Sequence, residues 1–298
     1  MQGLGIEFGF YRRWQGNQKV TDNLKLAPGD FKEFCVMVPT PAQANRNSIE
    51  GAGQQLCGFY DFTQQRTDLL GQVQNYTTHA KNFGDEIWVF SGFEFNVNAR
   101  MPGGLQLTGG TMTQRTRIES CYTVDSPMFS PTESRGTLST ADISNALAGA
   151  RTSTSMCKNA PPFKTTMKLM GMYPLPVWGV QISGTIQALP GPALNGTRTY
   201  SRAEILGLPA GTTLSAATLA LTVVEPNKNY APHVNKVDMR LSKVARVGTY
   251  RVTGGLDIFN VLNSADVLAV NTTVGPSWLN PTQVLGGRLF RVSARMDF

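Results

Sequence analysis

The sequence predicts an all-β fold, an antiparallel transmembrane β-barrel segment of about eight strands with long extracellular loops. Eight stretches alternate between apolar and polar residues with a period of two, the pattern of strands with two unlike faces. The connections between these stretches alternate strictly between short and long. Charged residues make up only 16% of the 298 residues and apolar residues 41%, a balance that suits strands placed between lipid and water.

The composition excludes several other classes of protein. No stretch approaches the ~18 uninterrupted apolar residues of a membrane helix, and the richest one, 214–224, is interrupted by serine and threonine. The 15 Phe, 8 Tyr and 4 Trp are too many for a disordered chain. The formal charge is +7, but the basic residues are dispersed and form no known motif. We therefore expect no nucleic-acid partner.

One face of each predicted strand is apolar and is expected to contact outer-membrane lipid. In chain order these faces carry Leu4, Ile6, Phe8 and Phe10; Phe93, Phe95, Val97 and Ala99; Leu105 and Leu107; Phe163, Met167 and Leu169; Val180, Ile182, Ile186 and Ala188; Val237, Met239 and Leu241; Tyr250, Val252, Leu256 and Ile258; and Phe290, Val292, Ala294, Met296 and Phe298. Each strand has about the ~9–11 residues that a tilted membrane strand needs. The last strand shows the alternation most clearly.

The opposite face of each strand is polar and is expected to line the barrel interior. Its lumen-facing charged residues include Glu94, Arg100, Asp238, Arg240, Arg251, Asp257, Arg291, Arg295 and Asp297. Two interpretations stay open for them. They hold a plug or line a substrate path, or they form the generic solvated interior of any wide barrel.

The connections give the predicted barrel its orientation. Three are tight turns rich in Gly and Pro, at 101–104, 173–177 and 246–249, and four are long, at 15–84, 119–161, 191–232 and 264–286. Ordinary domains have connections of about 4–6 residues, whereas outer-membrane barrels combine short periplasmic turns with long extracellular loops. A β-sandwich stays open as the structural alternative.

With the short turns in the periplasm, the C-terminus also lies there. Aromatic residues then fall at the two membrane interfaces, with Tyr173, Trp178, Tyr250 and Phe298 at the inner rim and Trp14 and Trp88 at the outer rim. In the second long loop, 140–151 has helix-compatible spacing and is expected to form one or two turns.

The four cysteines are placed where disulfides would join the ends of polar loops. Cys35 and Cys57 lie in the first long loop, and Cys121 and Cys157 lie in the second. None forms a C-x-x-C motif, so a zinc or thioredoxin-type site is not supported. The spacing predicts the bridges Cys35–Cys57 and Cys121–Cys157 and an oxidising compartment. Four unpaired buried thiols are the alternative.

The chain contains few of the residues and motifs that catalytic sites use. The two histidines, His79 and His233, are isolated, and a lone histidine is weak evidence for a site. There is no nucleophile elbow, zinc-protease motif, phosphate-binding loop or dinucleotide fingerprint. We therefore expect no enzymatic activity, no cofactor and no metal site.

Several stretches of the sequence are similar to a known family of outer-membrane proteins. The chain end G-R-L-F-R-V-S-A-R-M-D-F (287–298) is similar to the closing strand of outer-membrane barrels, and V-G-T-Y-R-V-T-G-G-L-D-I-F-N-V-L-N-S (247–264) is similar to the strand before it. Further similarity lies in F-Y-R-R-W (10–14), N-V-N-A-R-M-P-G-G (96–104), P-P-F-K (161–164), Q-I-S-G-T-I-Q-A-L-P-G-P (181–192) and P-S-W-L-N-P-T-Q-V-L-G-G-R (276–288). Together these stretches resemble the barrel domain of TonB-dependent receptors, in particular the Oar-like TonB-dependent transporters. The resemblance implies that Phe290, Val292, Ala294, Met296 and Phe298 form a C-terminal signal for the barrel-assembly machinery.

The resemblance also implies an outer membrane of Gram-negative type and uptake of a substrate energised through TonB. Such receptors carry a signal peptide, a TonB box and a plug domain, and close with ~22 strands. Residues 1–298 show none of the three segments, so we expect them to be the C-terminal part of a larger plugged barrel. TonB and the plug would then be partners through the missing upstream part. A small complete barrel of eight strands and a non-transporting surface protein or adhesin stay open as alternatives.

Overall fold

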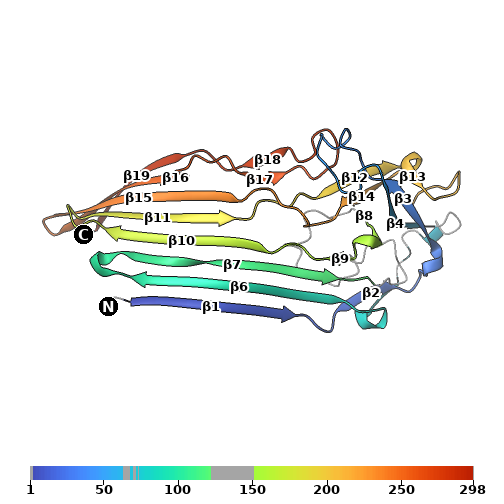
Figure 1. The fold of residues 1–298 in the computed structure, drawn as a ribbon, viewed down its shortest axis with the longest axis horizontal. Helices are drawn as coiled ribbons and strands as arrows, with labels where there is room; N and C mark the ends of the chain where they lie inside the picture. The colour runs from blue at the N-terminus through green and yellow to red at the C-terminus, as the bar shows by residue number, and fades with distance from the viewer. Residues whose placement is uncertain (1–2, 63–67, 70–71, 73, 122–150, 298) are drawn as a thin grey trace.

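A computed structural model describes residues 3–62, 68–69, 72, 74–121 and 151–297, and one antiparallel sheet of eight long strands dominates it (Figure 1). In spatial order the strands are β1 (Gly3–Trp14), β6 (Ile87–Arg100), β7 (Gln106–Glu119), β10 (Lys164–Pro174), β11 (Val180–Leu189), β15 (Val234–Val247), β16 (Tyr250–Phe259) and β19 (Leu289–Asp297). A two-residue strand, β9 (Lys158–Asn159), also pairs with β7. The predicted all-β class and the eight predicted strands are confirmed. No helix in the described ranges is long and apolar enough to span a membrane.

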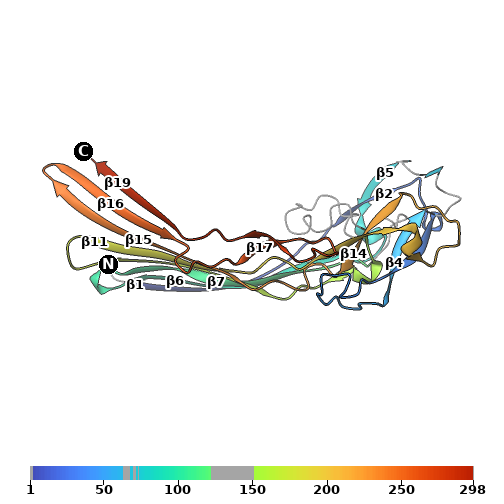
Figure 2. The ribbon, with the colours of Figure 1, turned by 90° about the horizontal axis from the view of Figure 1, so that it is seen from above.

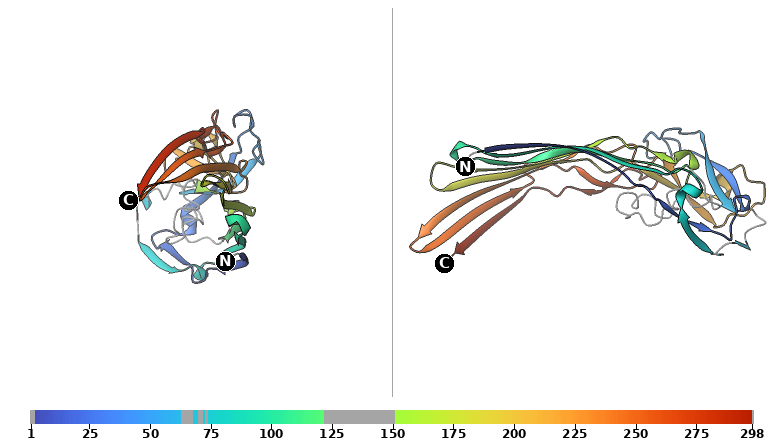
Figure 3. Two further views of the ribbon diagram at one scale, coloured as in Figure 1. Left: turned by 90° about the vertical axis from the view of Figure 1, so that its left-hand side faces the viewer. Right: turned by 90° about the horizontal axis from the view of Figure 1, so that it is seen from below.

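The sheet is curved and open. Within the described residues, β1 pairs only with β6 and β19 pairs only with β16, so each leaves one edge free. Seen along the strands, the sheet follows an arc rather than a closed ring (Figure 3). The eight strands form a single sheet and not the two packed sheets of a β-sandwich. Their lengths of 9 to 14 residues exceed the predicted range in β1, β6, β7 and β15.

The short and long connections lie at opposite ends of the sheet, as predicted. The β6–β7, β10–β11 and β15–β16 turns share one end with both chain termini, and the long connections share the other (Figures 1 and 2). Gly103 and Gly104 have φ of 78° and 86° in the β6–β7 turn, a backbone region that favours glycine. Tyr173, Trp178 and Tyr250 lie at the short-turn end, and Trp14 and Trp88 lie at the other.

The strand register places the predicted apolar faces of all strands on the same side of the sheet. Residues directly opposite each other on paired strands project to the same side of a sheet. Phe8 is opposite Phe95, Leu169 is opposite Ile186, and Leu256 is opposite both Leu241 and Val292. Rings of Phe10 and Phe93 lie 5.1 Å apart on this face. Large apolar side chains here are exposed, with Phe8 at 68% and Val292 at 83%, so this surface has no cover within the described residues.

The four long connections fold together into a second body, which we call the loop module. Its small sheets contain β2 (Lys19–Asn23) and β5 (Asn75–His79); β3 (Phe31–Met37), β4 (Gln55–Phe62) and β13 (Ile205–Leu206); β8 (Arg151–Thr152), β12 (Gly196–Ser201) and β14 (Thr218–Val224); and β17 (Val267–Val270) and β18 (Pro281–Val284). Short 3-10 helices at Pro28–Asp30, Ala80–Asn82, Pro102–Gly104, Thr154–Met156 and Arg202–Glu204 complete the described elements.

The loop module has a hydrophobic core drawn from three of the four connections. Phe34, Val36, Val38, Ala44, Ile49 and Phe59 come from the first, Tyr200, Ile205, Leu219, Leu221 and Val223 from the third, and Val274 and Trp278 from the fourth. The second connection joins through β8, which runs parallel to β14. The long connections therefore pack against one another, an arrangement that no local sequence pattern indicates. The run at 214–224, set aside as too short for a membrane helix, supplies the central strand of a module sheet.

Two sequence expectations fall on residues that the structure does not describe. The helical turns expected over 140–151 lie outside the described residues except for Arg151, which is in β8. Phe298, expected to complete the C-terminal signal, also lies outside them.

Candidate functional site

The nine charged residues singled out from the sequence all lie on the polar face of the main sheet. The register places them opposite polar residues or glycine, except that Glu94 also lies opposite Met112, and they are on the side away from Phe8 and Val292. They do not form one cluster, because β7, β10 and β11 separate Glu94 and Arg100 on β6 from the other seven. Glu94 accepts a hydrogen bond from Asn96 Nδ2 at 2.9 Å.

The other seven residues occupy three adjacent strands, β15, β16 and β19, and Asp257 is central to them. Its carboxylate is 5% exposed and lies 3.1 Å from Arg240 Nη1 and 2.9 Å from Arg291 Nε. Arg240 and Arg291 come from the two strands that flank Asp257, directly opposite it. One buried carboxylate therefore joins three strands through charge-assisted hydrogen bonds, which are stronger than neutral ones.

Asp238 and Asn260 join the end of the sheet to the fourth long connection. Asp238 Oδ1 accepts from the Asn260 N–H at 2.8 Å, and Asp238 Oδ2 lies 2.8 Å from Lys236 Nζ. Asn260 is 2% exposed, has a φ of 51°, and donates through Nδ2 to the carbonyls of Ser264 and Gly286. This residue belongs to the stretch F-N-V-L-N (259–263), within the segment 247–264 quoted above. Its side chain thus ties the start of the connection to its end.

The C-terminal strand leaves both its apolar face and one edge uncovered within the described residues. Phe290, Val292 and Met296 are 58%, 83% and 54% exposed, and Ala294 is exposed on the same face. Arg295 and Asp297 on the polar face form an ion pair at 2.7 Å. The strand therefore presents the alternation that the sequence predicts for a barrel-assembly signal.

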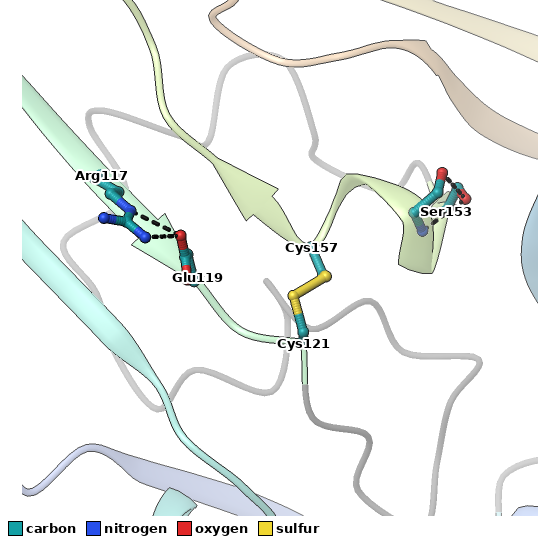
Figure 4. Close-up of a disulfide and its surroundings, with 6 residues drawn as sticks. Arg117, Glu119, Cys121, Ser153 and Cys157 are labelled. Atoms are coloured by element: carbon teal, nitrogen blue, oxygen red, sulfur yellow. Dashed lines mark hydrogen bonds and ion pairs between the residues drawn. A yellow bond between two sulfur atoms is a disulfide. The ribbon is translucent and has the colours of Figure 1, made fainter.

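Both predicted disulfides are present in the loop module. Cys35–Cys57 joins β3 to β4 across 22 residues, and Cys121–Cys157 joins the end of β7 to the segment before β9 across 36 residues. Figure 4 shows the second bridge beside the ion pair of Arg117 and Glu119. Ser153 Oγ donates to the carbonyl of Cys57, so the two bridged loops also contact each other.

A buried ion pair connects three of the long connections, and sequence reasoning missed it. Asp61 on β4 is 1% exposed and lies 3.2 Å from Arg151 Nη1 on β8. Its second oxygen accepts from the Ser215 N–H at 3.0 Å, and Arg151 also donates to the Tyr60 carbonyl at 2.9 Å. The only sequence signal was the charge of two isolated residues, which gives no partner.

Further contacts of the loop module run between its first, third and fourth connections. Trp278 is 2% exposed and donates from Nε1 to the Asn195 carbonyl at 3.0 Å. Tyr200 donates to the Met37 carbonyl at 2.9 Å, and burial raises the pKa of its hydroxyl. Lys228 Nζ lies 2.7 Å from Glu50 and 3.0 Å from Glu225. Hydrogen bonds to these two carboxylates raise the pKa of Lys228.

These contacts surround a cavity of about 400 Å³ at the meeting of the connections. Its walls include Ile49, Leu56, Met156, Val223 and Trp278, with Glu50 and Lys228 among its polar residues. This volume falls in the range of small-molecule sites. Among the described residues, no group of three or more His, Cys, Asp or Glu side chains is placed to hold a metal ion.

No family model and no curated protein sequence matches the chain. The chain is similar in structure to the outer membrane transporter YddB from Escherichia coli, with 9% sequence identity and a TM-score of 0.42. The alignment covers 99% of this chain and 30% of that transporter, so the chain spans less than a third of its length.

Proposed function

We propose that this chain is part of the wall of an outer-membrane β-barrel, the C-terminal portion of a TonB-dependent receptor that takes up a substrate with energy from TonB. One observation carries the proposal. An apolar face with exposed side chains runs along seven of the eight strands of the sheet and is interrupted at β7, where Gly109, Thr111 and Thr113 lie on the same side as Leu107. The other face of the sheet is largely polar. In water such a surface is costly, whereas a barrel wall needs it on its lipid side.

The ends of the sheet support the same proposal. All four long connections are at one end and the tight turns are at the other, the asymmetry of outer-membrane barrels. The free edges of β1 and β19 favour a wall that continues into further strands, because a complete eight-stranded barrel would pair them with each other. β19 would be the strand that the assembly machinery binds. A plug from an upstream part of the protein would contact the polar face.

The loop module would stand outside the cell and bind the substrate. Its core and two disulfides hold the four connections in one arrangement, and preorganised loops bind with a smaller loss of entropy. A non-transporting surface protein or adhesin is the second candidate, because a rigid module of this size also suits adhesion. We assign no enzymatic activity to either.

Retention on TonB separates the two candidates. The intact protein, extracted from outer membranes in non-ionic detergent, is expected to be retained on an immobilised periplasmic domain of TonB. Retention should be lost in the presence of excess soluble TonB domain. An adhesin without a TonB-binding segment would pass through the column, and that result would contradict the transport proposal while leaving the barrel wall intact.

A further inference from the structure

Five arginines lie along the polar face of β15, β16 and β19, from Arg291 near the long-connection end to Arg246 and Arg251 at the β15–β16 turn. They are Arg240, Arg246, Arg251, Arg291 and Arg295, and we call them the arginine patch. The register sets Arg246 directly opposite Arg251. Like charges directly opposite each other on neighbouring strands are destabilising. On its other side Arg251 lies opposite Asp297, whose carboxylate forms its ion pair with Arg295.

The carboxylates of this region neutralise only part of the arginine patch. Asp257 is shared between Arg240 and Arg291, and Asp297 pairs with Arg295. Five arginines and two aspartates leave three positive charges in excess. Within the described part of the chain, Arg246 and Arg251 have no ion-pair partner.

Four of the five arginines, all except Arg246, surround a cavity, and with Asp257 and Asp297 they leave two positive charges in excess there. An open cavity of about 470 Å³ is lined by Arg240, Arg251, Thr253, Arg291, Ser293, Ala294, Arg295 and Asp297. Four guanidinium groups and two hydroxyls are thus available as donors at one site. Planar guanidinium groups bind phosphate oxygens in pairs of parallel hydrogen bonds.

Gly255 allows the Arg240 side chain to reach this cavity. A Cβ at this position would lie 2.7 Å from Arg240 Nη2 and 2.8 Å from Ser293 Oγ, which is too close for either group to stay in place. The Arg240 guanidinium lies against the backbone here and approaches both Asp257 and Ser293 Oγ, the latter at 3.5 Å. Gly254, the next residue, has open space where its Cβ would be.

We infer that the arginine patch is a binding site for a doubly charged oxyanion, a phosphate or a phosphate monoester. The excess of positive charge matches a multiply charged anion better than a single carboxylate. The cavity is also larger than one phosphate group, which leaves room for a small organic substituent. The site depends on the sheet and not on transport, so it holds whether or not the intact protein binds TonB.

Equilibrium dialysis of radiolabelled inorganic phosphate against the intact protein in non-ionic detergent tests the site. We expect saturable binding that weakens at least tenfold in Arg251→Gln and several-fold in Gly255→Ala. Gly254→Ala, on the opposite face, and Arg100→Gln, on the polar face of β6, should bind phosphate as the unchanged protein does.

Glycerol 3-phosphate as a competitor distinguishes the two sources of the anion. If glycerol 3-phosphate displaces the bound radiolabelled phosphate at a lower concentration than unlabelled phosphate does, the ligand of the site is a phosphate ester. If glycerol 3-phosphate needs a higher concentration, the ligand is the free ion. The proposal is overturned if binding does not saturate, or if Arg100→Gln weakens it as much as Arg251→Gln does. An acidic polypeptide segment that fills the cavity would also prevent phosphate binding and so overturn it.

Discussion

Replacing Asp61 with alanine is expected to destabilise the loop module by about 3–5 kcal/mol, because the change leaves the Arg151 guanidinium without its buried partner. Asp61 is 1% exposed and connects Arg151 on the second long connection with Ser215 on the third. The change therefore weakens three of the four connections at once. Cleavage of the intact protein by thermolysin over a series of urea concentrations measures the free energy of opening the module.

Glu50→Ala is the matched control for this carboxylate. Glu50 also pairs with a basic residue of another connection, Lys228, but its side chain is 76% exposed. Exposed ion pairs contribute about 0–1 kcal/mol, so its removal should shift the cleavage midpoint little. Equal shifts for the two variants would contradict the role of Asp61 as a buried link.

Phe95→Arg is expected to cost about 2–4 kcal/mol when the protein folds into a lipid bilayer. Phe95 lies near the centre of β6 on the apolar face, 43% exposed, opposite Phe8 and Thr111. An arginine at this position would place its charge against lipid tails. Urea titration of the intact protein in phospholipid vesicles, followed by the shift in gel mobility between folded and unfolded forms, gives the cost.

The neighbouring variant Asn96→Arg controls for the size and charge of arginine. Asn96 projects to the polar face, where it is opposite Glu7 and donates to Glu94. Two acidic neighbours should accommodate the new charge. We therefore expect the free energy of unfolding to change by no more than about 1 kcal/mol, as for an exposed ion pair. If both arginines cost the same, the two faces of β6 do not meet different solvents.

The eight long strands could be predicted because their pattern is local. In a strand such as β19, Phe290, Val292 and Met296 lie on one side whatever the neighbouring strands are. The alternation of odd and even positions, which we call parity, therefore assigns the faces by itself. The loop module could not be predicted in this way. Its sheets pair β3 with β13 and β8 with β14, which lie in different connections, and no local pattern specifies partners at such distances.

In the candidate site, too, the face of each residue could be predicted from its position in the strand, whereas its neighbours on other strands could not. Parity placed Arg240, Asp257 and Arg291 on the polar face, but only the pairing of β15, β16 and β19 brings them together at one carboxylate. Arg246 was not singled out, because its position opposite Arg251 depends on the length of the β15–β16 turn. The disulfides were predictable because each bridge closes a loop within one connection.

The apolar face of the sheet is expected to meet lipid and the polar face to meet water. β11 lies inside the sheet, paired with β10 and β15, and the described residues contain no free cysteine to compete with an introduced label. Nitroxide labels at successive positions from Gln181 to Ala188, in the intact protein folded into vesicles, report contact with oxygen, which concentrates in lipid. We expect high accessibility to oxygen at Ile182, Gly184, Ile186 and Ala188 and low accessibility at the positions between them. A flat profile, or one with the opposite phase, would contradict it.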